Sequence, residues 1–214
     1  MADSSIIRNG MTLAAIAAIC TTLVAFTYQV TDERIAANEQ AWLEQSLQPA
    51  LAGLFFDSGV SESKLTVPAP HDLPGSEDAV IYRVYSGETP VAALFVVSAR
   101  DGYAGAIRLL VGINVDGAVT GIHVLAHRET PGLGDRVETS KSDWVKQFDG
   151  RSLSDPQADG WKIRRDGGNF DQLTGASVTP RAIVKAVKAT LLYFETNQVT
   201  VFGAAADEQD GGNE

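Results

Sequence analysis

The distribution of apolar residues changes several times along the chain. Residues 32–54 carry apolar side chains at helical spacing, which predicts an amphipathic helix. Residues 55–76 are rich in Pro, Gly and Ser and predict a loop. From Ala79 onward, short aliphatic and β-branched runs are typical of strands. The expected strands are residues 80–85, 91–99, 106–115 and 119–127.

Short turn signals separate these strands. Ser86-Gly87 and Asp101-Gly102 follow the first two runs, and Asp116-Gly117 follows the third. An Asp-Gly pair between strands favours a two-residue type I′ hairpin, because Gly accepts a positive φ. Consecutive strands joined by tight turns predict an antiparallel meander.

Two helices are expected in the second half of the chain. Residues 136–148 predict a short amphipathic helix. Residues 180–196 predict a stronger one, because Thr179 can cap its N-terminus and Pro180 suits its first position. Its inward positions are Ile183, Val184, Val187 and Leu191, and those of the shorter helix are Val137, Trp144, Val145 and Phe148. The expected fold is α+β, with an antiparallel sheet and flanking helices.

The N-terminal region predicts a retained membrane anchor. Residues 10–30 contain no charged side chain, and 19 helical residues span about 28 Å, close to the thickness of a bilayer. A cleaved signal peptide is the alternative, although no A-x-A site follows the apolar run directly. Arg8 precedes the span and Asp32 follows it. This asymmetry predicts residues 1–9 in the cytoplasm and residues 31–203 on the periplasmic side of a bacterial inner membrane.

Composition narrows the function. The net charge of −10 argues against nucleic acid as a partner, because phosphate binding needs clustered Lys and Arg. One Cys in 214 residues excludes an internal disulfide framework and a protein-held iron–sulfur cluster. An electron-transfer role would therefore need an organic cofactor. Residues 204–214 are acidic and are expected to form a disordered tail.

The segment before the last predicted helix carries the candidate chemistry. Residues 171–180 read DQLTGASVTP, with one glycine and three hydroxyl side chains directly before a helix N-terminus. Free backbone N–H groups and the helix dipole make such a place suitable for a phosphate. An ordinary helix cap would use the same residue types, so the spacing alone leaves both interpretations open.

This segment matches the flavinylation motif D-x-x-[ST]-G-A-[TS], and residues 129–135 read ETPGLGD. With these two blocks in this order behind an N-terminal span, the chain resembles the family of the G subunit of the Rnf electron-transport complex, called Rsx in some bacteria. It is also similar to the C subunit of the Na⁺-translocating NADH:quinone oxidoreductase. The resemblance covers most of the chain and implies an FMN-binding domain.

The resemblance implies a covalent cofactor. Ser177 would carry FMN as a phosphoester made by a dedicated flavin transferase, although most relatives have Thr at that position. Thr179 is a competing hydroxyl two residues further on. Asp171 would belong to the signal that the transferase recognises. The implied phosphate-lining residues are Thr174, Gly175 and Ala176, and those near the isoalloxazine or ribityl chain are Glu129, Thr130, Gly132 and Leu133.

The implied function is electron transfer within a membrane complex. The other Rnf subunits and the lipid bilayer would be the partners, and the complex would couple electron flow between ferredoxin and NAD to ion translocation. No substrate turnover of its own is expected. The alternatives are a cofactor-free membrane-anchored scaffold or assembly subunit, and the equivalent subunit of the NADH:quinone oxidoreductase.

Other candidate residues have ordinary explanations. His123 and His127 lie four apart with no third ligand nearby, and His71 lies in a loop, so no metal site is expected. Trp144 and Trp161 could stack near a flavin, but core packing is the default for such residues. The basic patch of Lys162, Arg164 and Arg165 predicts a solvated face, although a positive charge there would suit a flavin phosphate.

Overall fold

The computed structural model describes residues 10, 11, 13, 14, 16–18, 20–22 and 63–203. The described residues between 10 and 22 are helical and exposed. Among the described residues, no helix combines the length and the apolar character needed to cross a bilayer. The predicted span over residues 10–30 lies partly outside the described residues, and the predicted helix 32–54 and tail 204–214 lie entirely outside them.

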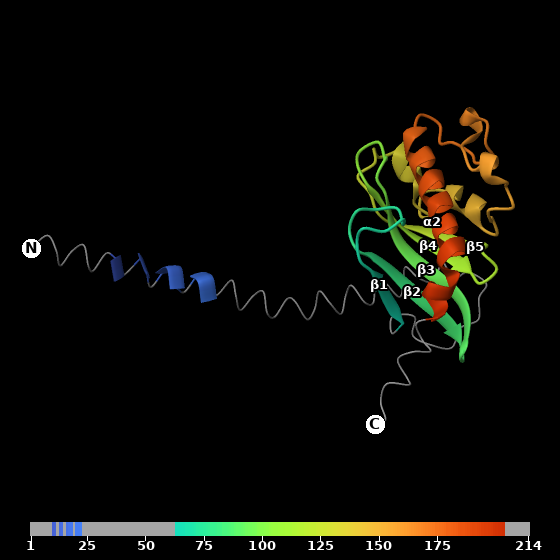
Figure 1. Ribbon diagram of the computed structural model, residues 1–214. Helices are drawn as coiled ribbons and strands as arrows, with labels where there is room; N and C mark the ends of the chain where they lie inside the picture. The colour runs from blue at the N-terminus through green and yellow to red at the C-terminus, as the bar shows by residue number, and fades with distance from the viewer. Residues whose placement is uncertain (1–9, 12, 15, 19, 23–62, 204–214) are drawn as a thin grey trace, which may run out of the picture. The chain divides into compact units, whose positions relative to one another are not determined.

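Five antiparallel strands form one sheet in sequence order (Figure 1). The strands are β1 (Lys64–Val67), β2 (Ala79–Ser86), β3 (Thr89–Ala99), β4 (Ile107–Asn114) and β5 (Val119–Ala126). The four predicted strands and the meander are confirmed. Strand β1 was not predicted: it lies within the stretch expected to be a loop and pairs with β2 at the sheet edge. Four residues are too few for a clear alternation beside a Pro-rich segment, so pairing with β2 decides this strand.

The turn between β4 and β5 is wider than predicted. Gly117 has φ +81°, but no described residue other than glycine has a positive φ, so Asp116 does not fit a type I′ turn. The Gly117 N–H donates to the Asn114 carbonyl at 3.0 Å, and the Asn114 N–H donates to the Ala118 carbonyl at 2.9 Å. The connection is therefore a three-residue loop with a glycine bulge. The Asn114 side chain stabilises it by accepting from the Ala118 N–H at 2.8 Å.

One long helix, α2 (Val178–Gly203), covers one face of the sheet (Figure 1). The predicted inward stripe is confirmed, because Ile183, Val184, Val187 and Leu191 are all buried. Phe95 of β3 meets Phe194 of α2 edge to face, with ring centroids 6.0 Å apart. The helix passes the predicted end at Thr196 through a kink at Asn197. Burial of these aliphatic and aromatic side chains is the main force that holds α2 on the sheet.

The predicted helix over residues 136–148 is wrong. Two short 3₁₀ helices, η2 (Gly134–Val137) and η3 (Trp144–Phe148), take its place. The hydroxyl of Ser142 donates to the Arg136 carbonyl and accepts from the Trp144 N–H at 3.2 Å, so this side chain takes the backbone partners that a helix would use. The four residues predicted to face inward, Val137, Trp144, Val145 and Phe148, are nevertheless buried.

An aromatic cluster supports the segment before α2. Phe148 and Phe170 stack with centroids 4.7 Å apart, and Trp161 lies 4.8 Å from Phe170. The indole N–H groups of Trp144 and Trp161 donate to the carbonyls of Asp171 and Ser152, at 2.7 and 3.1 Å. Both tryptophans therefore pack in the core, as the default interpretation expected.

Residues 160–170 fold back on this cluster as a closed loop, which begins at the end of η4 (Ala158–Gly160) and contains η5 (Arg164–Asp166). The Phe170 N–H donates to the Lys162 carbonyl at 3.1 Å, and the Arg164 N–H donates to the Phe170 carbonyl at 2.7 Å. Gly168 lies so close to this crossing that a Cβ there would fall 2.0 Å from the Lys162 oxygen. Only glycine fits at that position.

The Gly168→Ala variant should destabilise the domain by about 1–3 kcal/mol, because the added methyl forces two backbone segments apart. Gly203→Ala is the control, since among the described residues its Cβ would meet only Val199 Cγ1, at 3.6 Å, an ordinary contact. Urea unfolding followed by tryptophan fluorescence measures both. Equal free energies of unfolding for the two variants would contradict this account of the loop.

Candidate functional site

The two sequence blocks lie side by side in the structure. The block of residues 129–135 leaves the end of β5, and the block of residues 171–177 leads into α2. The Thr179 hydroxyl donates to Glu129 Oε2 across 50 positions of sequence. Leu133 Cδ2 lies 3.0 Å from the place where a Cβ of Gly175 would stand. The fold therefore brings both blocks to one site.

Glu129 makes the central connection at this site. Its side chain is buried, and its Oε1 accepts from the Ala104 N–H at 3.0 Å while Oε2 accepts from Thr179. A Cβ on Gly134 would lie 2.7 Å from Oε2, so the backbone packs directly against the carboxylate. Protein donors occupy both oxygens. The expected approach of Glu129 to a flavin is therefore limited to the part of its side chain that lines the neighbouring cavity.

Thr179 has a different role from the one predicted. The first hydrogen bond of α2 runs from the Arg181 N–H to the Ser177 carbonyl, at 3.3 Å, so Ser177 holds the cap position and Pro180 the third helical position. The Thr179 side chain is fully buried and its hydroxyl is used by Glu129. The prediction of Thr179 as the helix cap is wrong, and its buried hydroxyl is less accessible than that of the partly exposed Ser177.

A tight turn presents Ser177. The Ala176 N–H donates to the Leu173 carbonyl at 3.0 Å, and Gly175 at the third turn position has φ +83°. A positive φ at that position is typical of a type II turn and requires glycine. Thr174 at the tip is exposed, and Ser177 after the turn is partly exposed. The Ser177 hydroxyl is therefore accessible at the start of α2.

Three arginines surround this turn, and their partners differ. Arg164 pairs with Asp171 at 3.0 Å, and Arg181 binds Asp166 through two nitrogens at 2.7 and 3.0 Å. Arg181 lowers the pKa of Asp166 by hydrogen bonding to it. The Arg165 guanidinium donates to Ser177 Oγ at 3.3 Å. The predicted basic patch is thus not a uniform solvated face.

Asp171 is held by its backbone and presents an exposed side chain. Its N–H donates to Gln147 Oε1 and its carbonyl accepts from Trp144 Nε1, both at 2.7 Å. The carboxylate is exposed and paired only with Arg164 among the residues that the structure describes. This geometry fixes the start of the block of residues 171–177 against the aromatic cluster.

A cavity of about 320 Å³ separates the two blocks. Its lining residues are Tyr103, Glu129, Thr130, Leu133, Gly134, Gly175, Ala176, Ser177, Val178 and Thr179. Three of them are exposed apolar side chains, with Tyr103 71%, Leu133 42% and Val178 39% exposed. Gly132, Thr174 and Asp171 lie outside the lining, and Gly132 shapes the turn with φ +78°. An apolar rim beside an accessible hydroxyl and a helix N-terminus fits a flat ring with a phosphate at one end.

Two residues at this site, Tyr103 and Arg165, were not predicted individually from the sequence. Tyr103 lies in the loop between β3 and β4, away from both blocks in sequence. An isolated Tyr in a Gly-rich loop gives no signal of a site, and only the pairing of β3 with β4 brings it to the cavity. Arg165 was predicted as part of a patch, and the structure distinguishes it from Arg164 and Lys162 by its contact with Ser177.

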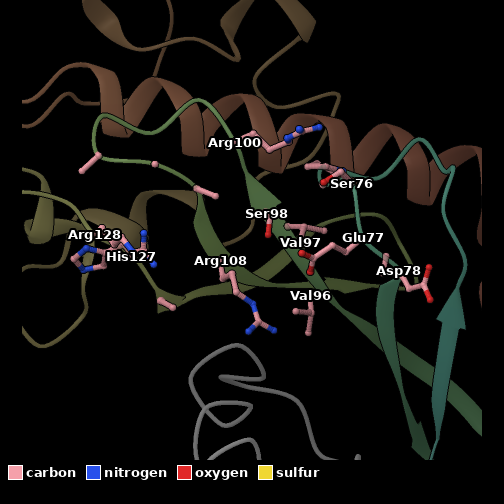
Figure 2. A pocket seen from close by; sticks show the side chains of 17 residues that line it. Ser76, Glu77, Asp78, Val96, Val97, Ser98, Arg100, Arg108, His127 and Arg128 are labelled. Carbon is pink, nitrogen blue, oxygen red and sulfur yellow. The ribbon is translucent and has the colours of Figure 1, made fainter.

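Figure 2 shows a second and larger cavity, of about 470 Å³, at the same end of the sheet. Arg100, Arg108, His127 and Arg128 line it together with Glu77 and Asp78. Neither sequence block contributes a residue to this cavity. The two cavities adjoin each other. Ala104 of the larger cavity follows Tyr103 of the smaller one in the sequence, and Arg128 of the larger cavity precedes Glu129 of the smaller one. The smaller cavity is therefore the candidate site.

The three histidines have separate surroundings. The His127 ring accepts from the Glu129 N–H and contacts Glu138 at 2.8 Å, whereas His71 Nε2 lies 2.8 Å from the Glu77 carbonyl oxygen. Burial lowers the pKa of His123 on β5. Within the described part of the chain, no three His, Cys, Asp or Glu side chains are grouped so that they could hold a metal ion.

An ionic network holds the block of residues 129–135 in place. Lys141 Nζ lies 2.6 Å from Glu138 Oε1 and 3.0 Å from Asp135 Oδ2. Hydrogen bonding to Lys141 lowers the pKa of both carboxyls and raises the pKa of Lys141. Since Glu138 also contacts His127, this network joins η2 to the residues that leave β5.

The Lys141→Met variant should have a lower free energy of unfolding than the wild type at pH values above the ordinary pKa of Asp and Glu carboxyls. Carboxyls with a lowered folded pKa stabilise the domain above their unfolded pKa, and this stabilisation disappears as the pH falls. Unfolding free energies measured from about pH 7 to about pH 3 should therefore decline more steeply in the wild type than in the variant. Lys146→Met, which removes a lysine from the exposed pair with Asp143 outside this network, is the control. Parallel curves for wild type and Lys141→Met would contradict the role of this network.

Comparison with known proteins agrees with the geometry of the site. The family model of the FMN-binding domain matches residues 102–192, and that of the RnfG N-terminal region matches residues 1–49. The first range includes every residue that lines the smaller cavity.

Full-length relatives share the same description. The chain is 39% identical to the G subunit of the ion-translocating oxidoreductase complex of Shewanella amazonensis, over 99% of this chain and 98% of that protein. Identity to the G subunit of Pseudomonas aeruginosa strain UCBPP-PA14 is 41%, over 98% and 97% of the two chains. With the G subunit of Vibrio atlanticus it is 40%, over 91% and 92%. The chain therefore belongs to the family of G subunits of the ion-translocating oxidoreductase complex, the Rnf subunits that carry an FMN-binding domain.

Proposed function

We propose that this chain is an electron carrier whose FMN is attached covalently to Ser177, within an Rnf-type complex that couples electron transfer between ferredoxin and NAD to ion translocation. The observation that carries the proposal is the placement of Ser177. Its accessible hydroxyl stands at the start of α2, beside a guanidinium and at the edge of a cavity with an apolar rim. These features suit the two ends of FMN, a phosphate and a flat ring.

The attachment reaction is a phosphoryl transfer. The donor is a flavin whose phosphate is activated as a phosphoanhydride, such as a flavin dinucleotide. The bond from Ser177 Oγ to phosphorus forms as the anhydride bond breaks, and the leaving nucleoside monophosphate takes the electron pair. The proton of the Ser177 hydroxyl goes to a base of the flavin transferase, which would recognise the exposed Asp171. A primary hydroxyl is a competent acceptor, so Ser serves as well as Thr.

The residues around the cavity would orient the cofactor. FMN exchanges one or two electrons, so when bound it connects one-electron and two-electron carriers. Leu133, Val178 and Tyr103 would cover the ring, and Gly175 and Ala176 would leave room for the phosphate beside the backbone. Thr130 lines the same cavity, but its carbonyl already accepts from the Leu133 and Gly134 N–H groups. Thr130 would therefore offer its side chain.

The covalent bond and the membrane anchor serve the same purpose. A noncovalent cofactor is lost when its free concentration falls below the dissociation constant, whereas an ester is retained. This advantage is greatest on the periplasmic side of the inner membrane, where we place residues 31–203. An anchor over residues 10–30 would restrict the domain to the membrane plane and raise its effective concentration beside the other Rnf subunits.

The Ser177→Ala variant should lose all covalently attached flavin but remain folded, because replacing a serine at the cap position of a helix costs only about 0.5–2 kcal/mol. Ser177→Thr should retain the flavin. Flavin fluorescence of the denatured protein on a gel, after coexpression with the transferase, measures both. Thr196→Val is the control, because it removes an exposed hydroxyl of the same helix that lies outside the cavity lining. Normal flavin in Ser177→Ala would rule out this attachment site. A colourless wild type would favour the cofactor-free scaffold.

The Leu133→Ser variant should keep the flavin attached but leave its ring more exposed to solvent. Losing the Leu133 side chain removes about 1 kcal/mol of apolar contact, which raises the population of exposed ring about fivefold. Quenching of native flavin fluorescence by iodide should increase by about the same factor. Leu192→Ser is the matched control, since Leu192 is similarly exposed, at 47% against 42%, and does not line the cavity. Equal quenching in the two variants would show that the ring lies elsewhere.

A further inference from the structure

We propose that Arg165 is the residue that binds the phosphate of the attached FMN and thereby fixes the direction in which the flavin leaves Ser177. This inference rests on the proposed attachment at Ser177 and assigns a role to a residue outside the flavinylation motif. It starts from the contact of the Arg165 guanidinium with Ser177 Oγ, at 3.3 Å.

The charges around the attachment turn single out Arg165. Of the three arginines there, Arg164 is neutralised by Asp171 and Arg181 is neutralised by Asp166. Arg165 makes no ion pair within the described residues, its charge acts on Asp166 only from a distance, and its guanidinium donates to the neutral Ser177 hydroxyl. Arg165 is therefore the arginine of this turn that has no carboxylate bound to it. A phosphodiester carries one negative charge, so attachment of FMN would supply the missing partner.

The geometry also favours this pairing. Phosphorus bonded to Ser177 Oγ would bring its two nonbridging oxygens to the guanidinium that already contacts Oγ. A guanidinium presents several N–H donors in a planar fork that matches phosphate oxygens, and charge-assisted hydrogen bonds of this kind are the strong ones. Arg165 would thus exchange a weak bond to a hydroxyl for a strong bond to an anion, without moving its backbone.

The backbone of Arg165 is already fixed for this task. Arg165 lies in η5, within the closed loop of residues 160–170 that packs on the aromatic cluster. Its N–H donates to Gln172 Oε1 at 3.2 Å, which ties the arginine to the motif segment itself. Gly167 ends η5 with φ +83° and Gly168 permits the close backbone crossing. The loop therefore positions the charge before the flavin arrives, which lowers the entropy cost of binding.

Lys162 is the natural comparison because it belongs to the same basic patch. It is exposed and lies at the beginning of the closed loop, where its backbone carbonyl accepts from the Phe170 N–H. Removing its charge changes the net charge of the patch by the same amount as removing that of Arg165. An effect specific to Arg165 therefore reports the contact with the phosphate and not the general field.

The test is phosphorus NMR of the full-length chain, flavinylated by coexpression with the transferase, in native and urea-unfolded states. In the wild type the signal of the attached phosphate should differ between these states. In Arg165→Gln the native signal should move to the unfolded position, because loss of one charge-assisted hydrogen bond lowers the bound fraction about tenfold. Arg165→Lys should give an intermediate signal, and Lys162→Gln should match the wild type.

The outcomes separate the two proposals. A wild-type protein with no attached phosphate signal overturns the attachment at Ser177 and this inference with it. A normal wild-type signal that is unchanged in folded Arg165→Gln overturns only the role of Arg165. If Arg165→Gln folds but takes up no flavin, Arg165→Lys decides, since an intermediate signal supports the contact and an unshifted one contradicts it.

Discussion

The buried carboxylate of Glu129 is the interaction on which the site depends. Its two oxygens accept from the Ala104 N–H and the Thr179 hydroxyl, so a single side chain joins the loop after β3, the exit of β5 and the start of α2. A buried carboxylate is costly unless hydrogen bonds satisfy it, and here both oxygens are satisfied. The cavity beside it is the space that these three segments leave between them.

The rest of the fold supplies rigidity on either side of this connection. On one side, the sheet and α2 share an apolar core that fixes the helix axis, and with it the position of Ser177 at the helix start. On the other side, the cluster of Phe148, Trp161 and Phe170 holds the closed loop that carries Arg165. The Ser177 hydroxyl and the Arg165 guanidinium are thereby placed by two different packing contacts, beside the cavity that the Glu129 connection holds open. A cofactor attached at Ser177 would meet an arrangement formed in advance.

Much of the fold follows from local sequence pattern. Strands β2 to β5 and the buried stripe of α2 were predicted, because the spacing of their apolar residues and their residue types agree with their environment in the fold. The edge strand β1 was not predicted, because its pairing with β2 decides it. The break of residues 136–148 into η2 and η3 was not predicted either, because it depends on the hydrogen bonds of the Ser142 side chain. The motif residues were found by resemblance. Their neighbours Tyr103 and Arg165 required the tertiary structure, since only folding brings Tyr103 to the cavity and separates Arg165 from the other two arginines.

The most direct test of the account is the mass of the peptide that contains Ser177. The full-length chain would be purified after coexpression with an active flavin transferase, denatured and digested. We expect this peptide to gain the mass of one FMN less one water, with fragment ions that locate the gain at Ser177. An unmodified peptide, or FMN found on another residue, would contradict the claim that this hydroxyl carries the cofactor.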